Sequence, residues 1–192
     1  MKMIYLISTR LVATLVIFLL SCQSEPTPEK IAKTEVIKPK ENAYEGLRNI
    51  ALHVTPEQLD LKLSTEGTEV YGVIMDWEMN GAVATTAAYS TGDASMYTST
   101  GGGVIGGGQH PNVNTAAKQL IVLAQSFVEK AEKTETTPLP QTNTVKFYFL
   151  TNKGFYSGEE VMTNFENSSS KWLKLFEEAN NVLTELRKTS EK

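Results

Sequence analysis

Residues 70–99 decide the fold, and they read VYGVIMDWEM-NG-AVATTAAY-STGD-ASMYTS. The first eight residues are rich in β-branched and aromatic side chains, which favour strands. Asn80-Gly81 is the dipeptide most typical of a tight β-hairpin, because both positions tolerate a positive φ. Segment 82–89 forms the return strand, and after a second glycine turn segment 94–99 adds a third. We therefore predict an antiparallel meander of three strands.

Helical patterns flank this meander on both sides. The spacing of apolar residues predicts a helix over 43–53, and Thr55-Pro56 is a start signal for a short helix over 56–62. Pro111 opens a long amphipathic helix whose apolar stripe continues to Ala131, and a last helix starts at residues 168–170.

A fourth strand is expected over 145–151, where the run is apolar enough to lie centrally in the sheet. The predicted fold class is α+β, with an antiparallel sheet of about four strands: the three-strand meander, a helix and the fourth strand. Helices near the N-terminus, in the middle and at the C-terminus pack this sheet. Residues 43–192 are expected to form a single domain.

Composition excludes several classes of function. The chain has 192 residues, a formal charge of −4 and a pI near 5.3, which argues against a nucleic-acid binder because a basic surface is lacking. One cysteine and two histidines leave too few ligands for a multi-cysteine or histidine-based metal cluster. We expect no metal site and no cofactor.

The first 22 residues have the organisation of a secretory signal. Lys2 and Arg10 precede the apolar run 11–20, and Ser21 provides a small residue before Cys22. The run is shorter than the roughly 20 residues that a membrane-spanning helix needs. An uncleaved anchor that began at Met3 would place Arg10 inside the bilayer at a cost of about 2.5–3.5 kcal/mol.

Leu19-Leu20-Ser21-Cys22 resembles the lipobox of bacterial lipoproteins. The resemblance implies cleavage between Ser21 and Cys22, so that 1–21 is a signal peptide, and it implies acylation of Cys22 as a membrane anchor. Several acyl chains are needed for stable anchoring, which fits that family. Gln23 in place of aspartate implies the outer membrane more than the inner one. A secreted protein with an incidental cysteine is the alternative.

Residues 22–42 are predicted to be a lipidated, flexible tether. Three prolines and mixed charges leave too little apolar surface for this segment to offset its ordering entropy. The tether would hold the domain clear of the lipid headgroups, in the cell envelope.

The glycine-rich stretch 101–110 is the candidate ligand-binding element. It matches G-x-G-x-x-G formally, but it follows a meander strand, so its context does not fit a dinucleotide site. Glycine-rich backbone before a helix can hold an anion; equally, these glycines can let strand and helix pack closely. The candidate residues are Gly101, Gly102, Gly103, Gly106, Gly107, Gly108 and His110.

Two further groups of side chains are candidates for function. Asp76 and Glu78 share one face of a strand end, with Asp93 expected nearby; they form either an acid pair or solvated carboxylates. Phe155 and Tyr156, in an expected loop, form either a contact surface or a cover over the sheet.

Stretches 70–76, 92–110 and 147–151 resemble an uncharacterised family of small bacterial proteins. The resemblance covers most of residues 44–185 and implies that the domain is one unit. It implies no activity, ligand or catalytic residue.

These patterns predict a lipid-anchored envelope protein whose domain binds a ligand or an envelope protein partner without catalysis. This prediction rests on two observations: the sequence has a complete pattern of core residues, and it has no obvious set of acid, base and nucleophile. The alternative is an envelope enzyme of the hydrolase type that uses Asp76, Asp93 and His110 around the glycine-rich loop. The sequence leaves open whether the protein is an enzyme, and it leaves the oligomeric state unknown.

Overall fold

The computed structural model describes residues 43–190, which form a seven-stranded antiparallel sheet with helices on both faces. The strands lie in the order β4-β3-β2-β1-β6-β7-β5. Their bounds are β1 Val70–Met79, β2 Ala82–Tyr89, β3 Ala94–Thr98, β4 Gly103–Val104, β5 Glu132–Thr134, β6 Thr144–Thr151 and β7 Gly154–Val161. The α-helices are α1 Ala43–Leu52, α2 Pro111–Gln125, α3 Met162–Glu166 and α4 Leu173–Ser190, and short 3-10 turns are η1 Glu57–Leu59, η2 Gly107–Gln109 and η3 Val128–Lys130.

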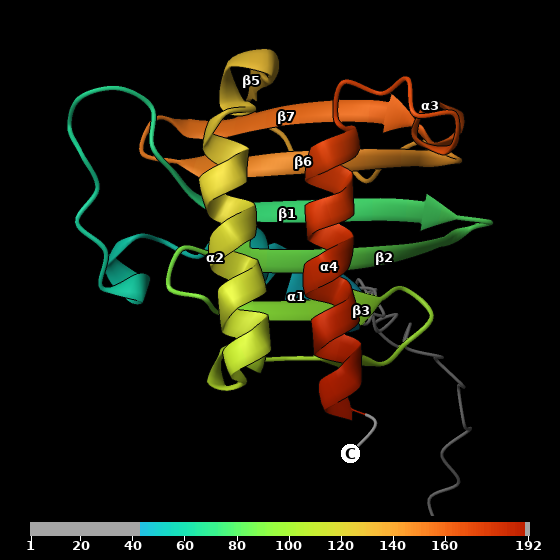
Figure 1. Ribbon diagram of the computed structural model, residues 1–192, viewed down its shortest axis with the longest axis horizontal. Helices are drawn as coiled ribbons and strands as arrows, with labels where there is room; N and C mark the ends of the chain where they lie inside the picture. Colours follow the sequence, from blue (N-terminus) through green and yellow to red (C-terminus); the bar gives the residue numbers. More distant parts are fainter. Residues whose placement is uncertain (1–42, 191–192) are drawn as a thin grey trace, which may run out of the picture. The chain divides into compact units, whose positions relative to one another are not determined.

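The sheet is the middle layer of three. The long helices α2 and α4 run antiparallel and side by side across one face, and α1 lies behind the sheet (Figure 1). The alternation of side chains along each strand separates two cores. One core lies under α2 and α4, and the other lies under α1 and the segment that follows it.

The meander and the central fourth strand are confirmed. β1, β2 and β3 pair consecutively in antiparallel register, and the turn between β1 and β2 has positive φ at Asn80 and Gly81. β6 lies between β1 and β7, so it is central as expected. The α+β class is therefore correct.

The expected number of about four strands is wrong, because the sheet has three more. β4 and β5 have two and three residues and take their pairing from a neighbouring strand. β7 was expected to be a loop, because Gly154, Gly158 and two glutamates weaken its strand pattern. Pairing along the whole of β6 overrides that weak local preference.

Helix boundaries differ from the expected ones in three places. The short helix over 56–62 is only the turn η1. α2 ends at Gln125, and the last apolar residues of its expected stripe lie in and around η3. α4 begins at Leu173, and Trp172, which was expected on its stripe, precedes it.

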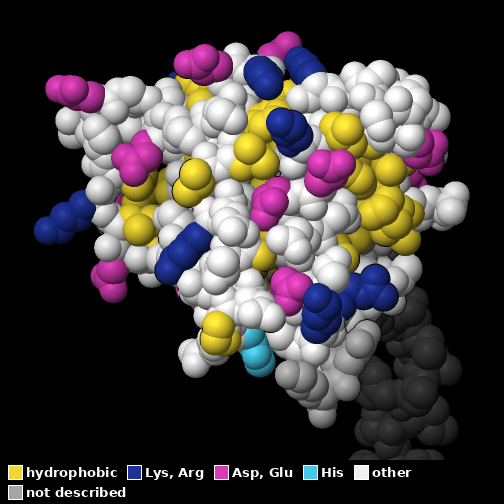
Figure 2. All heavy atoms as spheres, in the orientation of Figure 1, with side chains coloured by type: hydrophobic (Ala, Val, Ile, Leu, Met, Phe, Trp, Pro, Cys, Tyr) yellow, Lys and Arg dark blue, Asp and Glu magenta, His cyan; other side chains and the backbone are white. Residues whose placement is uncertain are grey.

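The core under α2 and α4 contains a stack of aromatic rings. Trp172 is 1% exposed, and its ring lies 5.9 Å from those of Phe127 and Phe147 and 6.1 Å from Phe149, measured between centroids. Gly158 of β7 makes room for this ring, since a Cβ there would lie 2.2 Å from the Trp172 Cζ2 atom. The outer surface of this helical face carries interspersed acidic and basic side chains (Figure 2).

Within residues 43–190, no helix combines the length and the apolar character that crossing a bilayer requires.

Candidate functional site

The face under α1 carries a row of polar side chains across the middle of the sheet. Backbone pairing places Tyr97, Thr85, Asp76, Lys146 and Glu159 opposite one another on β3, β2, β1, β6 and β7. Residues directly opposite in antiparallel strands share a face, so all five point to the side of α1. This row places ionisable and hydroxyl side chains from five strands on one face of the sheet.

At the centre of the row, Asp76 is fully buried and forms an ion pair with Arg48 of α1. The Arg48 Nη2 and Nε atoms donate to Asp76 Oδ2 at 2.6 and 2.9 Å, and Thr85 Oγ1 donates to Oδ1 at 2.6 Å. The guanidinium also lies over the Tyr148 ring, 5.6 Å from its centroid. Burial acts to lower the pKa of Arg48, but the hydrogen bond and attraction from Asp76 outweigh it and raise that pKa above its usual value. Asp76 is thus held as the partner of a permanent cation.

Hydrogen bonds fasten α1 to the sheet at every turn. The hydroxyls of Tyr44 and Thr85 are 2.8 Å apart, and Tyr89 donates to the carbonyl of Ala51 at 2.8 Å. Beyond the helix end, Tyr71 donates to the carbonyl of Val54 at 3.0 Å. These contacts follow helical spacing, so one face of α1 is polar and buried, and the sheet tyrosines satisfy carbonyls that a helix end leaves free.

A hollow of about 230 Å³ opens beside this network, between the start of α1 and the glycine-rich loop. Its apolar walls come from α1, β3 and Ile105, which is 66% exposed at the rim. Tyr97 lines the hollow, is 3% exposed, and has no hydrogen-bond partner for its hydroxyl among the residues that the structure describes. Burial raises the pKa of Tyr97 well above its usual value, so its hydroxyl stays protonated and can donate.

The structure divides the predicted glycine site into two parts. Gly101, Gly102 and Gly103 line the hollow beside α1. His110 is exposed and precedes α2, where it lines a different hollow of about 520 Å³ together with the last turns of α4. The seven candidate residues therefore do not form one site.

The glycines serve different physical purposes. Gly101, Gly102 and Gly106 have positive φ and open space around them, so they are needed for backbone conformation. Gly107 and Gly108 are needed for close packing, because added Cβ atoms would lie 2.3 Å from Leu186 and 2.2 Å from Asp93. Gly103 is also closely packed, because a Cβ there would lie 2.4 Å from the Met96 backbone oxygen. The packing alternative thus describes Gly103, Gly107 and Gly108, whereas Gly101 and Gly102 remain open to a ligand.

The carboxylates of the enzyme alternative do not come together. Asp76 and Glu78 do share a face, but both are buried; Glu78 accepts hydrogen bonds from the backbone N–H groups of Gly81 and Asn143. Asp93 lies at the far end of β2, and its carboxylate accepts from the Thr91 hydroxyl. No group of three acidic, histidine or cysteine side chains among residues 43–190 is arranged to hold a metal ion.

Phe155 and Tyr156 lie in β7 on opposite faces of the sheet, and both are half-buried. Phe155 packs on the core under α1 and Tyr156 on the core under α2 and α4. Both side chains therefore cover the sheet, which is the second of the two interpretations proposed from the sequence.

Sequence reasoning missed Arg48 and Tyr97 as members of the site. Arg48 follows Tyr44 by four residues, on the face that the apolar spacing assigned to the core. Asp76 stands within a strand of apolar residues, and a buried carboxylate needs a cationic partner. Together these two signals would have pointed to the ion pair.

Comparison with family models, with curated proteins and with solved structures found no match for this chain. Cys22 and Ser21, the predicted lipidation and cleavage residues, lie outside the described residues.

Proposed function

We propose that this chain is a lipid-anchored protein of the cell envelope whose domain binds a small aliphatic ligand without catalysis. The observation that carries the binding part is the hollow at Gly101–Gly103, which has apolar walls and is lined by Tyr97, a residue whose buried hydroxyl has no partner among the described residues. Binding sites of this kind are mostly apolar with a few placed polar groups. The lipobox resemblance supports the envelope location.

The size and chemistry of the hollow define the ligand class. Apolar cavities of about 150 Å³ accept molecules as large as benzene, so 230 Å³ suffices for a short aliphatic chain. Since the Tyr97 hydroxyl lacks an acceptor, the ligand should carry one oxygen acceptor, such as a carbonyl group. A buried donor without a partner is a cost to folding that a bound acceptor would remove.

The positions and partners of Asp76 and His110 favour a non-catalytic function. Asp76 is bound by Arg48 and Thr85, and His110 lies before α2, which covers the opposite face of the sheet from α1. A general acid and a general base must both lie within hydrogen-bond reach of the same bound substrate. The hydrolase alternative would need a different set of residues at the hollow.

Replacement of Tyr97 by phenylalanine should weaken ligand binding without weakening the fold. In the unmodified protein, a buried hydroxyl without a partner destabilises the native state by about 1–3 kcal/mol. The variant removes this hydroxyl, so its free energy of unfolding should stay the same or rise. Its affinity for hexan-2-one, a short ketone, should fall about fivefold to tenfold because one net hydrogen bond is lost. Urea unfolding and calorimetric titration measure the two quantities.

Tyr89→Phe is the matched control, because the Tyr89 hydroxyl donates to Ala51 and lies outside the hollow. That variant should lose about 1 kcal/mol of stability and keep its affinity for the ketone. Equal ketone affinity in Tyr97→Phe and the unmodified protein would contradict the proposed site.

Replacement of Cys22 by alanine should abolish the membrane anchor. In a bacterial host, the unmodified protein should sediment with membranes and incorporate labelled palmitate, whereas Cys22→Ala should do neither, because the thiol is the acylated atom. Mass spectrometry that found an intact Met1 and an unmodified Cys22 sulfur would refute the anchor while leaving the ligand site untouched.

A further inference from the structure

A second hollow, of about 320 Å³, lies at the outer edge of β7, beyond the point where β5 ends. It is lined by side chains from three directions: Lys130 from η3, Lys171 and Trp172 from the segment just before α4, and Glu132, Lys146 and Glu159 from the sheet. It does not overlap the hollow at Gly101–Gly103, and none of its residues was singled out by the sequence.

Two of its lysines are held on the buried aromatic stack without a carboxylate partner. The Lys130 Nζ atom lies 4.2 Å from the ring centroid of Phe127, and the Lys171 Nζ atom lies 5.1 Å from that of Trp172. Among residues 43–190, no carboxylate lies within ion-pair distance of either amino group. Lys146 differs, because it pairs with Glu159 at 2.8 Å. Neither Lys130 nor Lys171 is therefore neutralised by a direct ion pair, and the three lysines of the hollow outnumber its two carboxylates, Glu132 and Glu159.

The Trp172 indole adds a buried donor without an acceptor. Trp172 is 1% exposed, yet its Nε1–H has no hydrogen-bond partner among the described residues. A buried N–H normally finds an acceptor, and an exception calls for an explanation. Trp172 lines the hollow, so an anion seated there would lie beside the ring that carries this donor.

Backbone donors face the same hollow. Met162 N donates to Asn143 O at 2.8 Å, and the alternation of antiparallel bonding then directs the N–H of Glu159 away from β6. β5 begins at Glu132, opposite Ser157, so its pairing does not reach Glu159 and no strand receives that N–H. The first turn of α4 adds the positive end of a helix dipole.

We propose that this edge hollow binds a small oxyanion of the phosphate class. Lys130 and Lys171 supply the charge, and the Trp172 indole and the Glu159 backbone supply N–H donors. Glu159 pairs with Lys146, and Glu132 is the one other carboxylate in the lining, so the three lysines leave a net positive charge at the hollow. Free phosphate and the phosphodiester of a lipid headgroup share this chemistry.

Nuclear magnetic resonance of the indole N–H groups tests the site, because the chain has only two tryptophans. The whole protein in nonionic detergent is titrated with inorganic phosphate, against chloride at equal ionic strength. We expect a saturable shift of the Trp172 Nε1–H resonance with phosphate alone, while Trp77, which packs on Phe176, stays in place and reports an intact fold.

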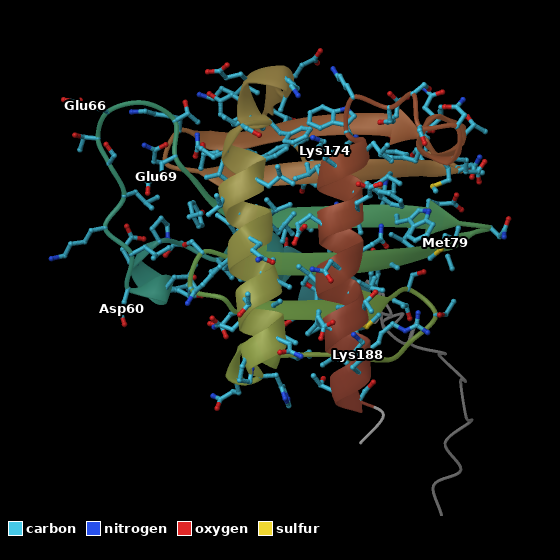
Figure 3. All side chains as sticks on the ribbon, viewed as in Figure 1. Asp60, Glu66, Glu69, Met79, Lys174 and Lys188 are labelled. Atoms are coloured by element: carbon cyan, nitrogen blue, oxygen red, sulfur yellow. The ribbon has the colours of Figure 1, made fainter. Side chains whose placement is uncertain are left out.

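Charge-removing variants localise the effect. Lys130→Gln and Lys171→Gln should each weaken phosphate binding at least fivefold. Lys188→Gln, in the last turn of α4 and far along the helix from Lys174 in its first turn (Figure 3), removes the same charge and should leave binding unchanged. A second titration with phosphatidylglycerol in the micelle distinguishes the sources: tighter binding of the lipid identifies a headgroup site, and tighter binding of phosphate identifies a site for the free ion.

A Trp172 resonance that moves with neither phosphate nor phosphatidylglycerol, or that moves equally with chloride, would overturn the proposal. Binding that survives both Lys130→Gln and Lys171→Gln would overturn it as well.

Discussion

Arg48→Met should lower the free energy of unfolding by about 3–5 kcal/mol, because it leaves the Asp76 carboxylate buried without its cation. Asp76 is fully buried and Arg48 nearly so, and water cannot replace the missing partner. Urea unfolding of the variant and of the unmodified protein measures the difference. We expect this loss of stability to exceed the loss caused by removing any other single contact between α1 and the sheet.

The double variant Arg48→Met/Asp76→Leu separates the lost ion pair from lost packing. Replacing both charges by apolar groups of similar volume is often neutral, so the double variant should recover most of the stability that Arg48→Met loses. Lys188→Met is the surface control, since its pair with Glu185 is exposed and worth about 0–1 kcal/mol. A double variant no more stable than Arg48→Met would show that packing, not charge, accounts for the loss.

Trp172→Ala should lower the free energy of unfolding by about 3–5 kcal/mol, because the indole is buried among three phenylalanine rings. Trp77→Ala is the matched control: Trp77 is half-buried and its ring packs edge-on against that of Phe176, at 5.3 Å between centroids. Its loss should be less than half that of Trp172→Ala. Urea unfolding again measures both, and equal losses would contradict the role of the stack.

Gly158 and Trp172 should also show coupled effects. Gly158→Ala places a Cβ against the indole and should cost about 1–3 kcal/mol in the unmodified protein. In a Trp172→Phe background the smaller ring leaves room, so the same change should cost less. Additive losses would mean that the glycine is needed for another reason.

The parts of the fold with strong periodicity were predictable from sequence. The meander over 70–99 and the helices α2 and α4 follow from hydrophobic spacing and from the Asn80-Gly81 turn. β7 was not predictable, because its glycines, Gly154 and Gly158, serve a turn and the Trp172 ring rather than a strand pattern. The pairing of β7 with β6 depends on tertiary contacts and not on the local strand preference of β7.

The candidate site was predictable only in part. The glycine-rich stretch was correctly singled out as unusual, but the sequence could not show that Gly101–Gly103 and His110 are separated by the turn η2. The Arg48–Asp76 pair joins residues 28 positions apart through the packing of α1. Only the folded arrangement of helix and sheet reveals which polar residues meet.

The hollow and the network under α1 form one physical unit. Tyr97 lies in the polar row with Asp76 and packs edge-on against Tyr44, at 6.3 Å between ring centroids. The ion pair holds α1 in place, and α1 supplies one wall of the hollow. Loss of Arg48 should therefore weaken both the fold and ligand binding, whereas loss of the Tyr97 hydroxyl should weaken binding alone.

Amide resonance mapping of the unmodified protein during titration with hexan-2-one tests whether the hollow beside α1 binds a ligand. We expect saturable shifts concentrated at the amides of Gly101, Gly102 and Gly103, with Ile105 alongside them. No saturable shift there, or the largest shifts at the exposed Val122 on α2, would show that the hollow beside α1 is not a binding site.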